Sequence, residues 1–201
     1  MKKKFKSFLA VILAVVMLFS FPLSASAFAR KDVTGTYRKS VAKMLRGVDY
    51  YLGVGCLENY SFKFDDYAKT TMIAIPDSKL NGCSLTYVKK KIQPKMKLYF
   101  NTSKVTFKKM SKYRYSKNPA YLVYIIYNTG DWGMASPKGS VRKIVRTGTR
   151  TYEVTYNIYL YNSWDKVNCG LMGTYKIYLK KANNKNGFII TNMKQTVSKK
   201  I

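Results

Sequence analysis

The first third of the chain after residue 27 carries apolar residues at a helical spacing. They recur every three or four positions and form one stripe: Tyr37, Val41, Met44, Leu45, Val48 and Leu52. This spacing predicts one amphipathic helix over that stretch. Thr34 or Thr36 can cap its start, and Gly53 and Gly55 are expected to end it.

Two further helical stretches are predicted before residue 100. The first runs from about Phe62 to Ile73 and stops before Pro76. The second begins near Ser84, with Leu85, Val88 and Ile92 on one side and Lys89, Lys90 and Lys91 on the other. With Lys95 and Lys97, these lysines form one basic set on the helix. Pro94 is expected to kink or end this helix, because proline lacks the amide donor and clashes with the preceding turn.

From Val105 onward the period of the pattern changes to two, which is typical of β-strands. Val105 and Phe107 alternate with polar residues, and residues 121–127 form a nearly continuous apolar run, as in a central strand. In the next strand we expect two faces, one with Val141, Lys143 and Val145, the other with Arg142, Ile144 and Arg146.

Residues 152–161 give the clearest strand, with Tyr152, Val154, Tyr156, Ile158 and Leu160 on one face and Glu153, Thr155, Asn157, Tyr159 and Tyr161 on the other. Strands at 175–180 and 188–193 follow, separated by a turn at 183–187. Helices followed by hairpin-linked strands predict an α+β fold, with N-terminal helices packed on a curved antiparallel sheet of four to six strands. We expect residues 28–201 to form one domain.

Residues 1–27 have the pattern of a secretory signal peptide. A lysine-rich start precedes an apolar run from Phe8 to Leu23, and Ala25-Ser26-Ala27 is a small-residue cleavage site. The alternative is a retained anchor, but the run is shorter than the roughly 20 residues that span a bilayer. We therefore expect cleavage after Ala27 and a secreted or extracytoplasmic protein of bacterial origin.

The closing strands resemble those of the nuclear-transport-factor-two-like or SnoaL-like α+β cone. The similar segments are residues 173–181, a short polar turn, and residues 187–194, which begin Gly187-Phe188-Ile189-Ile190-Thr191. The resemblance implies a cone-like roll over about residues 33–197. Its members include enzymes such as ketosteroid isomerase and proteins that only bind ligands, so it implies no single activity.

Positive charge dominates the composition. The chain has 37 Lys and Arg against nine Asp and Glu, a net charge of +28. The first 27 residues carry four lysines and no acid, so cleavage leaves +24. Such an excess favours anionic partners, namely nucleic acid, acidic lipid or a wall polymer. The alternative is that lysine serves solubility alone.

The absence of histidine removes several chemistries. It excludes Ser-His-Asp and Cys-His catalysis and histidine-ligated metals. The sequence also contains no phosphate loop, dinucleotide fingerprint or nucleophile elbow. Asp65 and Asp66 point about 100° apart on a helix and do not form a chelating pair. We therefore expect no catalytic motif, no metal site and no cofactor.

The mature chain has three cysteines, which an extracytoplasmic protein can oxidise. Cys56 and Cys83 flank one helical segment and are the expected disulfide pair, which would leave Cys169 free. The alternative is three thiols buried as small apolar groups.

Two groups of residues are candidate ligand-binding sites. Asp131 and Trp132 follow the apolar run and line either a pocket mouth or an ordinary turn, and Trp164-Asp165 is similar. Arg142, Arg146, Lys176 and Lys180 are expected on one outer sheet face with Tyr159, Tyr161 and Tyr178. Basic residues interleaved with aromatics suit single-stranded nucleic acid or a sugar-phosphate polymer. The alternative is an ordinary solvated sheet face.

These observations favour a non-enzymatic binding module for an anionic polymer or surface. A second hypothesis is a small-molecule carrier or a proton-transfer enzyme, with a tyrosine and a buried aspartate inside the cone. A third is a membrane-active or host-directed secreted protein. A homodimer formed through the sheet is a further possibility.

Overall fold

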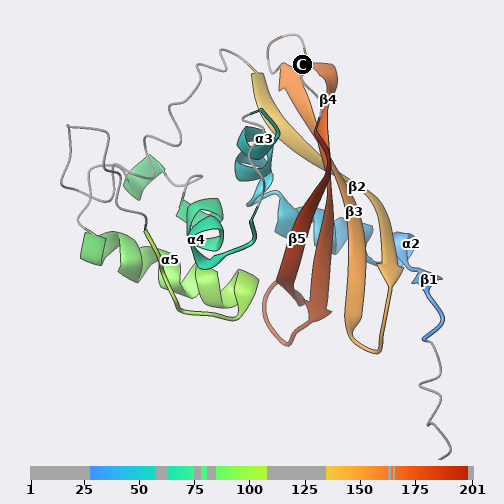
Figure 1. The fold of residues 1–201 in the computed structure, drawn as a ribbon, viewed down its shortest axis with the longest axis horizontal. Helices are drawn as coiled ribbons and strands as arrows, with labels where there is room; N and C mark the ends of the chain where they lie inside the picture. Colours follow the sequence, from blue (N-terminus) through green and yellow to red (C-terminus); the bar gives the residue numbers. More distant parts are fainter. Residues whose placement is uncertain are drawn as a thin grey trace, which may run out of the picture. The chain divides into compact units, whose positions relative to one another are not determined.

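The computed structural model describes residues 28–57, 63–74, 78–80, 85–107, 135–162, 164 and 166–198 (Figure 1). The chain divides into two units, residues 1–30 and 31–201, and the fold described here is that of the second. The expected signal peptide, the strand at 121–127, and Asp131, Trp132 and Asp165 lie outside the described residues. In the part of the chain that the structure describes, no helix is long and apolar enough to cross a membrane.

The expected helix over 37–52 is wrong in one respect, because it is two helices. Helix α2 spans Thr34–Leu45 and helix α3 spans Asp49–Leu57, with a break around Gly47. A side chain at Gly47 would meet the Tyr99 hydroxyl at 2.6 Å, so the chain turns where tyrosine packs against bare backbone. Gly53 does not end α3 but lies within it. Its missing side chain leaves room for Pro137.

The cap of α2 also differs from the expectation. Val33 is the N-cap residue and makes no side-chain cap bond. Asp32 accepts the Thr34 amide at 2.9 Å, while the Thr34 hydroxyl accepts the amide of Ile144 at 2.8 Å. Thr34 therefore ties the helix to the sheet instead of capping it.

Helices α4 (Asp66–Ala74) and α5 (Leu85–Phe100) follow, with the 3-10 turn η1 (Ser78–Leu80) between them. Asp65 caps α4 by accepting the Ala68 amide at 2.8 Å. Helix α5 continues through the exposed Pro94, because apolar residues on both sides of it pack into the core at every fourth position: Val88, Ile92, Met96 and Phe100.

The expected strand at Val105 is absent from the described residues 101–107. This segment is irregular and runs along α4, where the Thr106 amide donates to the Thr70 hydroxyl at 3.0 Å. Val105 and Phe107 pack against the core without a strand partner.

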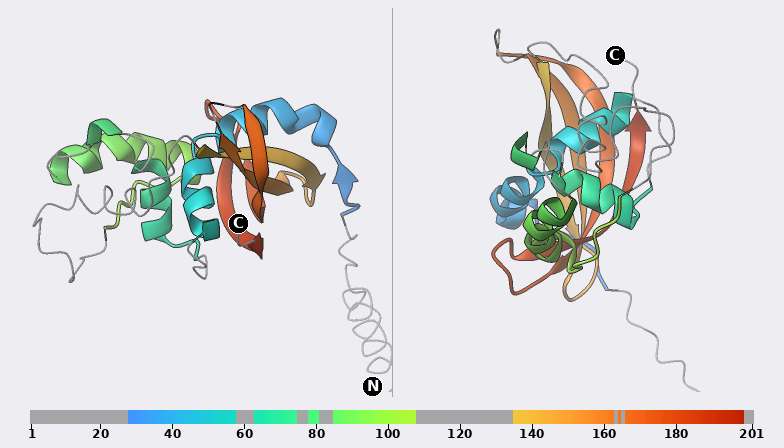
Figure 2. Two further views of the ribbon diagram at one scale, coloured as in Figure 1. Left: turned by 90° about the horizontal axis from the view of Figure 1, so that it is seen from above. Right: turned by 90° about the vertical axis from the view of Figure 1, so that its left-hand side faces the viewer.

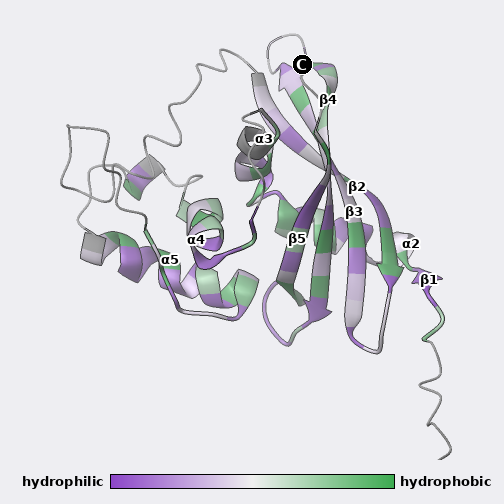
Figure 3. Ribbon diagram, viewed as in Figure 1, coloured by the Kyte–Doolittle hydropathy of each residue, from purple (hydrophilic) through white to green (hydrophobic). Residues whose placement is uncertain are grey.

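Five antiparallel strands form the sheet, in the order β1 (Lys31–Asp32), β2 (Ala135–Arg146), β3 (Thr151–Asn162), β4 (Val167–Lys181) and β5 (Phe188–Ser198). The described fold is therefore α+β, with helices preceding the sheet as the sequence pattern predicts. Figure 3 shows apolar and polar positions alternating along β3 and β5.

The core lies between the helices and one face of the sheet. Helix α2 packs on β2, α3 packs on β2, β3 and β4, and α5 packs beside β5 (Figure 2). The inner sheet face contributes Tyr152, Val154, Tyr156, Ile158, Tyr175, Ile177, Leu179, Ile190 and Met193, all buried. No described helix covers the opposite face, which we call the outer face.

Candidate functional site

The strand register places basic residues of three strands, β2, β4 and β5, on the outer face. Residues directly opposite each other in neighbouring strands project from the same face. One row across the sheet therefore consists of Lys143, Thr155, Lys176 and Lys194. Parallel rows add Lys138 opposite Tyr159, and Lys180 opposite Thr151.

A β-bulge adds one further cation to this face. The register shifts between Val141 and Lys143, so Arg142 is an extra residue in β2. Val141 and Ile144 are both buried, while Arg142 and Lys143 are both exposed. We call the resulting set the outer basic face: Lys138, Arg142, Lys143, Lys176, Lys180 and Lys194.

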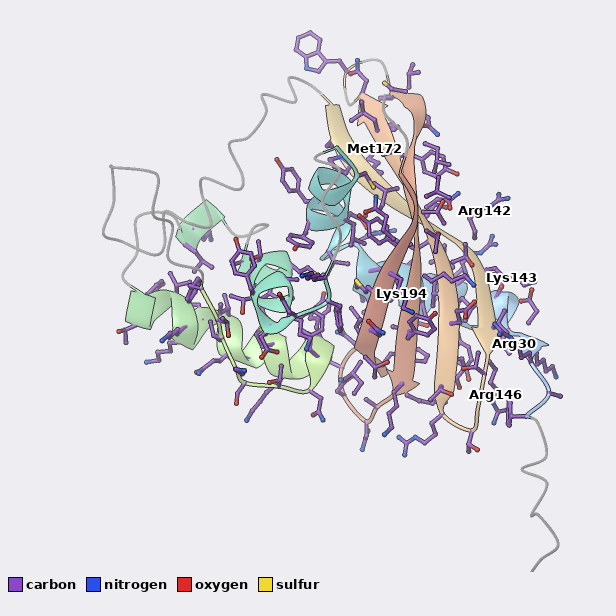
Figure 4. All side chains as sticks on the ribbon, viewed as in Figure 1. Arg30, Arg142, Lys143, Arg146, Met172 and Lys194 are labelled. Atoms are coloured by element: carbon purple, nitrogen blue, oxygen red, sulfur yellow. The ribbon has the colours of Figure 1, made fainter. Side chains whose placement is uncertain are left out.

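Figure 4 labels Arg142 and Lys143 on β2 and Lys194 on β5, towards opposite edges of the sheet.

Two acids are present on the described outer face. The Glu153 carboxylate lies 2.9 Å from Lys176 Nζ, and that of Asp32 lies 4.0 Å from Lys143 Nζ. A hydrogen bond from Thr34, with a smaller effect of Lys143, lowers the pKa of Asp32. The face therefore keeps an excess of positive charge at neutral pH.

Tyrosines lie between these cations. Lys138 Nζ lies 3.2 Å from the centre of the Tyr161 ring, a cation–π contact. The Tyr159 hydroxyl accepts from Asn157 Nδ2 at 2.9 Å, and Asn157 accepts from the Thr174 hydroxyl at 3.0 Å. These bonds restrain the aromatic side chains, which favours a preformed surface.

The structure brings together three of the four basic residues that the sequence singled out. Arg142, Lys176 and Lys180 lie on the outer face. Arg146 does not, because the bulge reverses the alternation and sets it opposite the buried Tyr152. Its guanidinium donates instead to the carbonyls of Gly148 and Thr149, each at 3.2 Å.

Sequence reasoning missed three members of the outer basic face. Lys143 was expected beside Val141, on the wrong side of the bulge, and Lys138 and Lys194 received no role. The signal available for both was the two-residue spacing of a strand face. Lys138 lies two residues before Ser140, and Lys194 lies two residues after Asn192. The other candidate, Asp131 with Trp132, lies outside the described residues, while Trp164 is 72% exposed.

Comparisons with protein-family models, with curated proteins and with solved structures found no match. The resemblance to the nuclear-transport-factor-two-like cone therefore stays an expectation from the sequence.

One carboxylate points between α3 and the sheet. Asp49, in the first turn of α3, accepts the Tyr156 hydroxyl at 2.5 Å and the Gly139 amide at 3.0 Å. Burial raises the pKa of Asp49, with the hydrogen bond from Tyr156 acting in the opposite direction. Burial, followed by the charge of Asp49, raises the pKa of Tyr156. Both carboxylate oxygens have partners, so Asp49 fastens α3 to β2 and β3.

Cys56 lies nearby on the same helix. Its sulfur lies 3.6 Å from the Tyr175 hydroxyl, which itself donates to the Leu52 carbonyl at 2.8 Å. Burial raises the pKa of the Cys56 thiol. Cys83 lies outside the described residues, so the Cys56–Cys83 disulfide stays a prediction. The described Cys169 is exposed, and no three potential metal ligands cluster within the described residues.

The outer face is not the only basic surface. Helix α2 exposes Arg38, Lys39 and Lys43, and helix α5 exposes Lys89, Lys90, Lys91, Lys95 and Lys97. Exposed positive charge is therefore not confined to one region of the described surface. Of these surfaces, the outer face carries its cations on three strands together with three tyrosines.

Proposed function

We propose that this domain is a non-enzymatic module that binds an anionic polymer through the outer basic face. The observation that carries the proposal is the row of Lys143, Lys176 and Lys194 across β2, β4 and β5, next to Arg142. Neighbouring strands are about 4.8 Å apart, so these cations extend over about 14 Å. A row of that length suits several consecutive charges of a flexible chain better than one small anion.

The tyrosines support a polymer with flat or ring-shaped units between its charges. Tyr159, Tyr161 and Tyr178 are partly exposed on the outer face. Aromatic side chains that alternate with cations bind single-stranded nucleic acids and similar chains by stacking and by charge together. Lys138 already lies over one of these rings, so a ligand at that place meets a charge and an aromatic edge together.

The proposal includes two expectations from the sequence. Removal of residues 1–27 places the domain outside the cytoplasm, where anionic wall polymers and acidic lipid surfaces are available partners. The second expectation is that the helices and this five-stranded sheet form a cone-like roll. A homodimer through the outer face is disfavoured, because two copies of the basic face repel each other.

Three variants that each replace three exposed cations with glutamine test the proposal. The outer variant is R142Q/K143Q/K194Q, the α5 variant is K89Q/K90Q/K97Q, and the α2 variant is R38Q/K39Q/K43Q. The probe is a short fluorescent polyphosphate, and its affinity is measured by anisotropy between about 50 and 200 mM salt. Poly-glutamate of similar charge separates phosphate recognition from attraction to any polyanion.

The outer variant removes three of the six cations of the outer basic face and is expected to lose about half of the salt dependence. Each lost phosphate contact lowers the slope of log K against log salt by about 0.7, so three contacts lower it by about 2. The α5 and α2 variants carry the same net charge and are expected to bind the short probe nearly as wild type does. Equal loss in all three variants would mean that net charge alone attracts the probe, and the proposal would fail.

A proton-transfer enzyme is the second candidate, because Asp49 is an inward carboxylate with a raised pKa and a tyrosine partner. In such a site the carboxylate must be available to a substrate. Asp49 instead uses one oxygen for Tyr156 and the other for Gly139. This arrangement favours a role in stability, which the unfolding measurements in the Discussion test.

A further inference from the structure

We propose that α5 forms a second polyanion-binding surface, so that one molecule bridges two polymer chains. This inference rests on the proposed function of the outer basic face. It adds that binding joins polymer chains instead of only coating them.

Exposed lysines extend along helix α5. Its 16 residues include five lysines and no acid. Only the stripe of Val88, Ile92, Met96 and Phe100 is fully directed into the core. Lys90 and Lys97 lie on the side of the helix opposite that stripe, separated by seven residues or about 10 Å along the axis.

The neighbouring acids do not neutralise this helix. Helix α4 packs against α5, but the Asp66 carboxylate binds Lys69 at 3.3 Å and Lys104 at 2.7 Å. Asp65 is used as the cap of α4. Among the described residues, no ion pair involves Lys89, Lys90, Lys91 or Lys97, whereas Lys91 Nζ lies 5.3 Å from the ring centre of Tyr87. Tyr87 is 45% exposed, so α5 repeats the combination of lysine and tyrosine found on the outer face.

The two basic surfaces are separated by the core. The inward residues of α5 belong to the same apolar cluster as Ile177, Leu179 and Ile190 of the inner sheet face. The exposed side of α5 and the outer face therefore look away from that cluster in different directions. Packed layers are about 10 Å apart, which exceeds the screening length of about 8 Å at physiological salt. A polymer on one surface leaves the other charged and accessible.

Bridging is tested with two pools of long polyphosphate, one labelled with an energy-transfer donor and the other with an acceptor. Energy transfer is recorded while protein is added, at concentrations that give equal occupancy for each variant. We expect transfer with the wild-type protein and with the α2 variant. The α5 variant should bind the short probe within about twofold of wild type, because the outer basic face is screened from the charges removed on α5. It should nevertheless give little energy transfer, because only one binding surface remains.

The outcomes separate the two proposals. If the outer variant loses binding but the wild-type protein produces no energy transfer, bridging is overturned and the proposed function stays intact. Loss of transfer in the α2 variant with transfer retained in the α5 variant would overturn the choice of α5. An outer variant that binds the short probe as tightly as wild type would instead overturn the proposed function.

Discussion

Removal of the acid at the centre of the outer face should strengthen ligand binding. Glu153 lies opposite Tyr178 and next to the cation row, where its carboxylate is 2.9 Å from Lys176 Nζ. The side chain of Glu153 is 13% exposed and that of Lys176 is 42% exposed, so this ion pair is close to water. The substitution Glu153→Gln keeps the shape and a hydrogen-bond acceptor but removes the charge.

The size of the effect follows from distance. A phosphate oxygen on the far side of the Lys176 ammonium would lie about 2.9 Å from that nitrogen and hence about 6 Å from Glu153. Two unit charges 6 Å apart in a medium of dielectric constant about 60 repel by about 0.9 kcal/mol. Loss of that repulsion corresponds to about fivefold tighter binding. The salt slope should steepen by about 0.7, because Lys176 becomes available for one more contact.

The matched control is Asp66→Asn. It changes net charge by the same amount and also removes the partner of two lysines, Lys69 and Lys104, but on the helix side. Anisotropy with short polyphosphate should show little gain for this variant. If Asp66→Asn strengthens binding as much as Glu153→Gln, or if Glu153→Gln has no effect, the polymer does not contact the centre of the outer face.

The remaining predictions concern the Asp49 contact and two glycines. Asp49→Ala leaves the Tyr156 hydroxyl and the Gly139 amide without their acceptor, and urea titration should show a loss of about 2–4 kcal/mol in unfolding free energy. Because burial raises the pKa of Asp49, the folded state binds its proton more tightly than the unfolded state. Its contribution is then largest at low pH and is lost as pH rises through the folded pKa, so wild type should lose stability relative to Asp49→Asn as pH rises above the ordinary aspartate pKa of 3.8. A parallel pH dependence of the two proteins would contradict this. Gly139→Ala would push a methyl group into Tyr156 and Asp49 and should destabilise the domain by several kcal/mol. Gly35 has open space around it, so Gly35→Ala should stabilise α2 by up to about 1 kcal/mol. Thermal unfolding measures both effects.

The sequence pattern predicted the fold class because most of β3 and the stretch of β4 from Tyr175 to Leu179 alternate without interruption. Tyr152, Val154 and Tyr156 are buried, as the alternation requires. Where the pattern failed, a single contact decided the structure. The break at Gly47 depends on Tyr99, which lies 52 positions later, and periodicity carries no information about such a partner.

The candidate site shows the same limit more sharply. Alternation in residues 141–146 assigned Arg146 to the outer face, but the extra residue Arg142 shifts every later position by one. The presence of valine and isoleucine three positions apart, at Val141 and Ile144, is compatible with a bulge but also with a short helix. Pairing with β3 settles the matter, and pairing is a property of two strands that one strand's sequence does not determine.

The fold itself does not need the cations of the outer face. Its described core is apolar, and exposed ion pairs such as Lys143 with Asp32 contribute at most about 1 kcal/mol. A surface with this excess of one charge weakens the folded state by self-repulsion. Any polyanion that binds only the folded chain relieves that repulsion and stabilises the domain by mass action. The stability of the isolated chain therefore does not explain the positive charge, and the anionic partner that we propose would explain it.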